Sequence, residues 1–138
     1  MAKGRIYTSN YPETPPEWYW VSGLHDAGIV GVETIEFPFD YNKFIREKRK
    51  YIRNLLVLKI NAKNALYDTT VKEIRLYNYK ILTPHISIES EGIIWWMADR
   101  LIENDNDYVL EIDLLNYDSD PENSTFKIKF ERAEVIRS

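Results

Sequence analysis

Runs of alternating apolar and polar residues recur along this 138-residue chain, and they predict β-strands. The clearest run is 55–62, where every second residue is apolar and the first half carries extra apolar residues, so that half is expected to be covered on both faces. Residues 29–37 are rich in β-branched side chains and end at Pro38, which is typical of a strand end. Further strands are predicted over 71–82, 108–114 and 126–135.

Two of these strands change the parity of their apolar positions. The change near Leu76, and a second one between Phe130 and Ala133, each predict a bulge or a twist, because a one-residue slip moves side chains to the other face of a sheet. Between the last two long strands, residues 118–123 form a polar, proline-containing turn. The strands on either side of it are therefore expected to pair as a hairpin.

Two segments leave the choice between helix and strand open. Residues 93–102 place Ile94, Met97, Ala98 and Leu101 at helical spacing, but they also alternate as a strand, and we favour the strand. Residues 42–52 put apolar side chains on one helical stripe after Asp40 or Asn42, either of which suits a helix cap. One short helix or a charged β-connection is expected there.

Together these patterns predict a mainly β protein: a single antiparallel domain of six or seven strands, sandwich or open barrel-like, with at most one or two short helices. Residues 1–17 are expected to form an extended N-terminal arm, because 8–17 hold three prolines that favour extended backbone. The antiparallel β domain is expected to span 18–138, a size that suits one hydrophobic core.

The composition excludes several classes of site. The chain has no cysteine, which rules out disulfides, thiolate metal sites and cysteine nucleophiles, and we expect a cytoplasmic protein. No secretion signal or long apolar run is present, so we expect no membrane association. The net charge of −4 is modest, but its distribution is uneven: 43–53 hold six basic residues against Glu47 alone, whereas 99–122 hold nine acids against Arg100.

The dipeptide His25-Asp26 is the first candidate for chemistry. A histidine beside an aspartate suits metal binding or acid–base work, with His85 and a further carboxylate as possible co-ligands, but the spacing gives no sign that the two histidines meet. The simpler interpretation is a turn in which both side chains bond to nearby backbone. No glycine loop for nucleotides and no serine-hydrolase elbow occurs, so we assign no catalytic residue, no metal and no cofactor.

The basic run 43–53 is the second candidate. Its cations alternate with Phe44, Tyr51 and Ile52, which suits either a solvated face or the acidic surface of a protein partner. Nucleic-acid binding is not expected of a chain whose net charge is negative. Candidate binding residues from this run are Arg46, Lys48 and Arg49.

Four tryptophans complete the candidate binding residues. Trp95 and Trp96 are adjacent, so on a strand they face opposite ways: one is expected in the core and the other can anchor an interface. Trp18 and Trp20 precede His25 and Asp26, and we expect them chiefly to pack that turn. The candidate set is therefore Trp18, Trp20, His25, Asp26, Trp95, Trp96, Arg46, Lys48 and Arg49.

The order of several short motifs resembles a group of small, mostly uncharacterised bacterial β-proteins that carry an early His-Asp-Ala motif. Some of these are similar to immunity proteins of bacterial polymorphic toxin systems. The resemblance covers about 18–136 and implies an antiparallel β fold that acts by binding; the proline-rich arm and the basic run depart from its pattern. The motifs are Gly23-Leu24-His25-Asp26-Ala27-Gly28-Ile29, Asn54-Leu55-Leu56-Val57-Leu58, Ile74-Arg75-Leu76-Tyr77, Trp95-Trp96, Tyr108-Val109-Leu110-Glu111-Ile112 and Phe126-Lys127-Ile128-Lys129-Phe130.

The sequence therefore favours a non-enzymatic module that binds a protein partner, and the resemblance suggests an immunity-type inhibitor of a bacterial toxin. The alternative is a small-ligand or metal-dependent enzyme that uses a cleft near His25 and Asp26. The two hypotheses differ in what surrounds His25, because an enzyme needs further polar groups within reach of it. Oligomeric state stays open.

Overall fold

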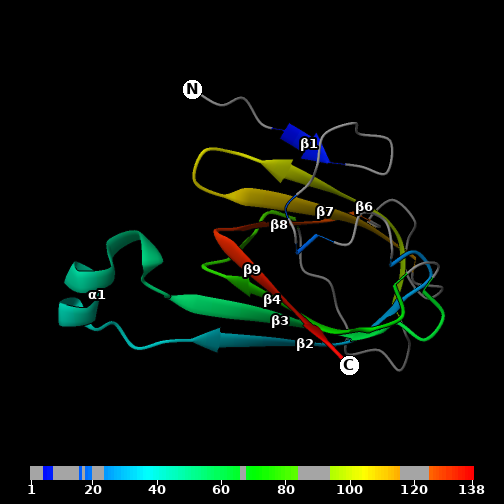
Figure 1. Cartoon of the computed structure of the whole chain (residues 1–138), viewed down its shortest axis with the longest axis horizontal. Coiled ribbons are helices and arrows are strands. Elements are labelled where there is room, and N and C mark those ends of the chain that lie inside the picture. The colour runs from blue at the N-terminus through cyan, green and yellow to red at the C-terminus, as the bar shows by residue number, and fades with distance from the viewer. Residues whose placement is uncertain are drawn as a thin grey trace.

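In a computed structural model of the protein, every strand lies antiparallel to its neighbours in one sheet (Figure 1). The structure describes residues 5–7, 16, 18–19, 24–65, 68–83, 94–115 and 125–138. The mainly β, single-domain antiparallel fold predicted from the sequence is thereby confirmed. The strands are β1 (Arg5–Tyr7), β2 (Gly28–Glu36), β3 (Asn54–Asn61), β4 (Val71–Tyr77), β5 (Lys80–Ile81), β6 (Ile94–Glu103), β7 (Tyr108–Leu115), β8 (Thr125–Phe130) and β9 (Arg132–Arg137).

The sheet closes on itself, because the strands at its two ends are connected to each other. Along the sheet the order is β5-β8-β7-β6-β2-β3-β4-β9, and β1 pairs with β6 off this path. β5 continues β4 after a break at Asn78, and β9 continues β8 after a break at Glu131. Because β4 pairs with β9 and β5 pairs with β8, the two end strands of the path are joined through these breaks.

These breaks correct the predicted strand count. Eight strands lie along the path, with β1 beside β6, where the alternation predicted six or seven. The long strand predicted over 71–82 is divided at Asn78, whose φ of 55° is left-handed, and the last strand is divided at Glu131. Both breaks fall close to the predicted parity changes, because a bend in a strand re-aims its side chains as a bulge does.

The inner face of the curled sheet carries the hydrophobic core. Alternate residues of β3, β4, β7 and β8 meet there, and burying each such side chain stabilises the fold by roughly 1.5–3 kcal/mol. β3 is also buried on its outer face through Leu55 and Val57, as its continuous apolar run predicted. The fully buried core residues of these four strands are Leu56, Leu58, Ile74, Leu76, Leu110, Ile112, Ile128 and Phe130.

Residues 94–102 of the ambiguous segment lie in strand β6, which pairs with β7 along its length, and residue 93 lies outside the described residues. Its register shifts between Trp96 and Ala98, so the buried side chains after the shift are Asp99 and Leu101 rather than residues 98 and 100. One extra residue in an alternating strand gives spacings of two and three, which resemble the spacing of a helical face. That bulge explains why the sequence alone left the choice open.

The predicted short helix is α1 (Tyr41–Glu47), followed by a 3-10 turn, η1 (Lys48–Lys50). The side chain of Asp40 caps it by accepting a hydrogen bond from the backbone N–H of Lys43 at 3.1 Å. None of the residues of α1 is buried. Figure 1 shows why: α1 stands beyond the ends of β2 and β3, away from the rest of the sheet. No helix among the described residues is long and apolar enough to cross a membrane.

The predicted N-terminal arm is described in part. Its residues 5–7 form β1, which pairs with the end of β6. Apart from Pro16, the rest of 1–17 lies outside the described residues, as does the predicted hairpin loop 118–123. The two strands that flank this loop, β7 and β8, pair antiparallel, which agrees with the predicted hairpin.

Candidate binding surface

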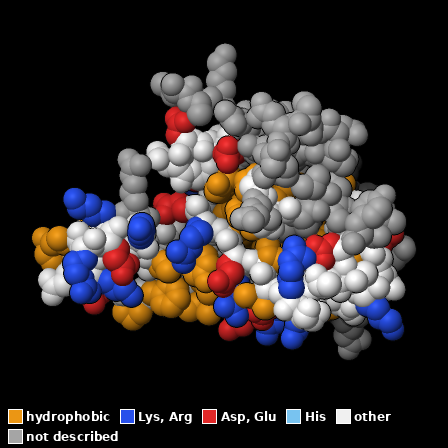
Figure 2. Space-filling model, in the orientation of Figure 1, with side chains coloured by type: hydrophobic (Ala, Val, Ile, Leu, Met, Phe, Trp, Pro, Cys, Tyr) orange, Lys and Arg blue, Asp and Glu red, His pale blue; other side chains and the backbone are white. Residues whose placement is uncertain are grey.

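The segment 37–53 between β2 and β3, here called the projection, displays an unusual number of apolar side chains. Phe39 is 67% exposed and Tyr41 is 65% exposed, although large apolar side chains are usually buried. Figure 2 shows hydrophobic side chains gathered where β2 and β3 lead into the projection, with lysine and arginine side chains beside them. Clusters of exposed apolar side chains are typical of interaction sites, which makes the projection the candidate surface. The exposed members are Phe37, Phe39, Tyr41, Phe44 and Ile45.

Three aromatic rings hold the projection together from within. Tyr51, only 3% exposed, makes edge-to-face contacts with Phe39 at 5.8 Å and with Phe44 at 5.5 Å between ring centroids. Phe39 and Phe44 also contact each other at 5.7 Å. Such pairs are each worth about 0.5–1.5 kcal/mol beyond the area they bury. The exposed faces of Phe39 and Phe44 are therefore held in place before any partner arrives.

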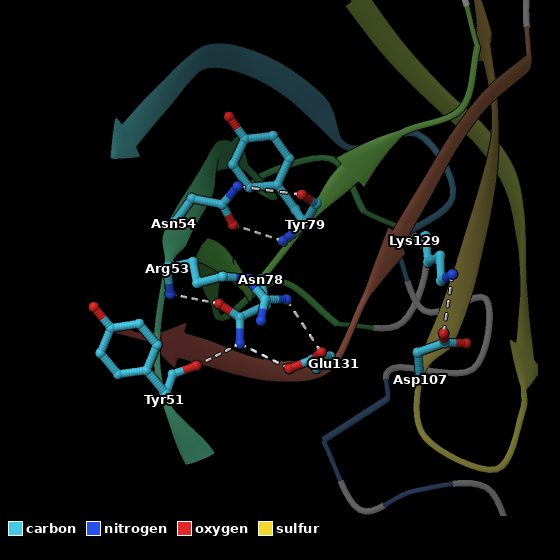
Figure 3. A network of polar contacts seen from close by, with 8 residues as sticks. All are labelled: Tyr51, Arg53, Asn54, Asn78, Tyr79, Asp107, Lys129 and Glu131. Atoms are coloured by element: carbon cyan, nitrogen blue, oxygen red, sulfur yellow. Dashed lines mark hydrogen bonds and ion pairs between the residues drawn. The ribbon is translucent and has the colours of Figure 1, made fainter. Parts of the chain in front are cut away.

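The base of the projection is fastened to the sheet by Asn78 (Figure 3). Its Oδ1 accepts a hydrogen bond from the backbone N–H of Arg53 at 2.6 Å. Its Nδ2 donates to the carbonyl of Tyr51 at 2.8 Å and to Oε2 of Glu131 at 2.7 Å. One side chain at the β4–β5 break thus ties the end of the projection to the β8–β9 break.

A second asparagine, Asn54, reinforces the same junction (Figure 3). Its Oδ1 accepts from the backbone N–H of Tyr79 at 2.8 Å, and its Nδ2 donates to the carbonyl of Tyr79 at 3.3 Å. Its own carbonyl accepts from the N–H of Asn78 at 3.0 Å. Asn54 begins β3 immediately after the projection, so these bonds fix the direction in which the projection leaves the sheet.

The projection is also the most cationic part of the described structure. Arg46 and Lys48, two of the predicted binding residues, are exposed, as are Lys43 and Lys50. The side chains of these four residues make no ion pair or hydrogen bond with the residues that the structure describes. Arg53 at the base, by contrast, lies 3.4 Å from the carboxylate of Glu131. Arg49, the third predicted residue, lies in η1, and its side chain is outside the described residues.

His25 and Asp26 lie in a turn that is bonded to the sheet through its backbone. The N–H of Asp26, which has a left-handed φ of 73°, donates to the carbonyl of Trp96 at 2.8 Å. The Nδ1 atom of His25 lies 3.1 Å from Oδ2 of Asp26, without the alignment of a hydrogen bond. Among the described residues no group of three histidine, aspartate or glutamate side chains is placed to hold a metal ion. His85 lies outside them.

Of the adjacent tryptophans, Trp96 is completely buried and Trp95 is half-buried, so one of the pair lies in the core as predicted. The indole Nε1 of Trp96 donates to Oδ2 of the buried Asp99 at 2.7 Å. The hydroxyl of Tyr19 donates to the other oxygen of the same carboxylate. Burial, with the nearby negative charge of Asp99, raises the pKa of Tyr19 well above its usual value. Trp96 thus supports a buried polar contact and is inaccessible to a partner.

Trp18 also packs inward. Its ring meets those of Tyr108 at 5.4 Å and Phe130 at 5.8 Å, both edge-on, and it covers one side of the core. Trp20 lies outside the described residues. Trp18 and Trp96 therefore contribute to the core. Of the other predicted binding residues, the structure places the His25-Asp26 turn against Trp96 and gathers Arg46 and Lys48 on the projection.

The sequence interpretation did not select the exposed apolar residues of the projection. The sequence places Phe44 and Ile45 on a helical stripe, which normally packs on a core, and it also places Phe44 among the cations of the basic run. Phe39 and Tyr41 flank the helix cap and belong to no periodic pattern. The signal that was present is the close alternation of apolar and basic residues from 37 to 53. Comparison with protein-family models, curated proteins and solved structures found no match for this chain.

Proposed function

We propose that this protein is a non-enzymatic protein-binding module and that the projection is its binding surface. The observation that carries the proposal is the exposure of Phe39 and Tyr41 on a segment whose own structure is fixed. Exposed aromatic side chains are the commonest anchors of protein interfaces. Rings that are already ordered lose little conformational entropy on binding, so more of the contact energy appears as affinity.

The internal bonding of the projection supports this proposal further. Tyr51 and Asn78 make several specific contacts that order the projection. The helix of the projection has no buried residue, so these contacts add little to the main core. A loop that only joined two strands needs no such contacts, since short β-connections suffice for that purpose. The contacts are accounted for if the projection has to present a defined surface.

A narrower form of the proposal is that the partner is a bacterial toxin and that the protein is its immunity-type inhibitor. The short motifs that resemble those of immunity-like β-proteins support this form. Its test is functional: purified protein at a one-to-one ratio should abolish the activity of a toxin encoded beside its gene. Full toxin activity at a tenfold excess of this protein would refute the narrower form and leave the general one standing.

The general proposal is tested by site-specific photo-cross-linking in the cell of origin. A benzophenone amino acid replaces Tyr41 on the projection or, as the matched control, the exposed Lys72 on β4. The proposal predicts one defined protein cross-linked from position 41 and absent from position 72. Cross-linking of the same proteins from both positions, or of none from position 41, would contradict it.

A further inference from the structure

We infer that the partner recognised by the projection presents an acidic protein segment with apolar side chains among its carboxylates. This inference rests on the proposed function and adds the chemistry of the partner to it. The distribution of charge along the chain is the first observation that supports it. Residues 43–53 hold six basic residues and one acid, a charge of +5, so the other residues together must carry −9 to give the total of −4.

The cations of the projection lie available around the exposed rings. Lys43, Arg46, Lys48 and Lys50 are exposed, and among the described residues none of the four has an ion-pair partner. Elsewhere on the described surface, many basic side chains lie beside carboxylates: Arg75 lies 3.0 Å from Glu73, and Arg100 lies 2.6 Å from Glu111. Lys72 and Lys80 are exposed on separate strands, so the projection differs in gathering four such cations in one short segment.

An acidic partner would be attracted to the projection and repelled by the remainder of the molecule. That arrangement guides the partner to one end of the protein and excludes other orientations. The rings between the cations add apolar contact, so the complementary segment must offer apolar side chains as well as carboxylates. Figure 2 shows the two kinds of side chain next to each other at the base of the projection.

Nucleic acid fits these observations less well. A phosphate backbone follows an extended basic surface, and here the basic surface is one short segment on a molecule whose remainder carries −9. The exposed aliphatic side chain of Ile45 also suits an apolar protein side chain better than a base. Nucleic-acid binding is therefore the alternative that the following experiment has to distinguish from binding of an acidic protein segment.

The test uses the full-length protein and three fluorescent probes of matched length. The first is a peptide of about twelve residues that alternates aspartate with leucine, the second replaces aspartate by lysine, and the third is an oligothymidine of the same length. We expect the acidic peptide to bind at least about tenfold more tightly than either other probe, and its affinity to fall as salt is raised. Tighter binding of the oligothymidine, or no saturation by the acidic peptide at about 1 mM, would overturn the inference.

Charge-reversal variants locate the contact. Arg46→Glu combined with Lys48→Glu should weaken binding of the acidic peptide by about tenfold or more. The matched control reverses two exposed lysines elsewhere, Lys72→Glu with Lys80→Glu, and should change affinity by less than about twofold. Equal losses in the two double variants would overturn the inference. A cross-linked partner without an acidic segment would refute this inference alone, whereas the absence of any partner at position 41 would refute the proposed function.

Discussion

The hydroxyl of Tyr51 accepts a hydrogen bond from the backbone N–H of Asp40 at 2.9 Å. This bond joins the residue that caps α1 to the ring at the centre of the aromatic cluster. The ring of Tyr51 also contacts Phe39 and Phe44, so one side chain orders both the entry to the helix and the apolar surface beside it. The shape of the projection thus depends on a residue that a partner would barely touch.

Tyr51→Phe tests that dependence, because it keeps the ring and removes the acceptor. We expect the projection alone to lose about 1 kcal/mol of stability against local opening, since the N–H of Asp40 loses its acceptor. Hydrogen exchange measured by NMR should show faster exchange at Asp40 and in α1, with the sheet unchanged. Tyr41→Phe is the matched control, because Tyr41 is exposed and its hydroxyl bonds to no residue in the described part of the chain. Identical exchange in the two variants would contradict this role for Tyr51.

Asn78 combines a left-handed backbone with three side-chain hydrogen bonds, and two substitutions separate these contributions. Asn78→Gly allows the left-handed backbone but removes the side-chain hydrogen bonds, so it should lower the free energy of unfolding by about 1–2 kcal/mol. Asn78→Ala removes the bonds and also disfavours the left-handed backbone, so it should lower the free energy of unfolding by roughly 1 kcal/mol more. Urea unfolding measures the difference. Equal losses in the two variants would show that the left-handed conformation at Asn78 is not a source of strain.

The buried contact between Tyr19 and Asp99 predicts a loss of stability in alkali. Burial raises the pKa of Tyr19 in the folded chain above its unfolded value. The unfolded chain therefore releases this proton above about pH 10 while the folded chain keeps it. The contribution of Tyr19 to the free energy of unfolding is complete below about pH 10. It falls by about 1.4 kcal/mol per pH unit as the pH rises towards the pKa of Tyr19 in the folded chain.

The measurement is urea unfolding of wild type and Tyr19→Phe at three pH values near 9, 10 and 11. We expect wild type to be the more stable by about 1–2 kcal/mol at the lowest pH, because Asp99 loses a donor in the variant. The advantage should shrink above pH 10, since phenylalanine has no proton to release. An advantage that stays constant to the highest pH would mean that Tyr19 titrates normally in the folded protein.

Most of the fold could be predicted from the sequence because alternation reports directly on which face of a strand is buried. Leu56 and Leu58 are buried where the pattern places them. The parity changes predicted a distortion close to both divisions, at Asn78 and Glu131, but not that the strands end there, because a bulge and a break change the parity alike. The bulge after Trp96 made β6 ambiguous in the sequence, because one extra residue interrupts the alternation of apolar and polar residues by which a strand is recognised.

The candidate surface could be predicted only in its charged part. Solvated cations such as Arg46 are recognised by their density in the sequence, and the structure leaves them exposed. The apolar part could not be predicted, because an apolar stripe on a helix looks the same whether or not another element covers it. Phe44 and Ile45 remain uncovered since α1 stands beyond the end of the sheet, which is a fact of tertiary structure.

The affinity of the cross-linked partner for Tyr41→Ser, measured by calorimetry, tests the central claim most directly. Tyr41 is mostly exposed and, unlike Phe39, is not one of the three rings that pack together within the projection, so its replacement should change the thermal midpoint little. The control is Leu82→Ser, which removes another exposed apolar side chain outside the projection. If the projection is the binding surface, Tyr41→Ser should raise the Kd by about tenfold or more and Leu82→Ser by less than about twofold. A Kd for Tyr41→Ser within about twofold of the wild-type value would contradict the claim.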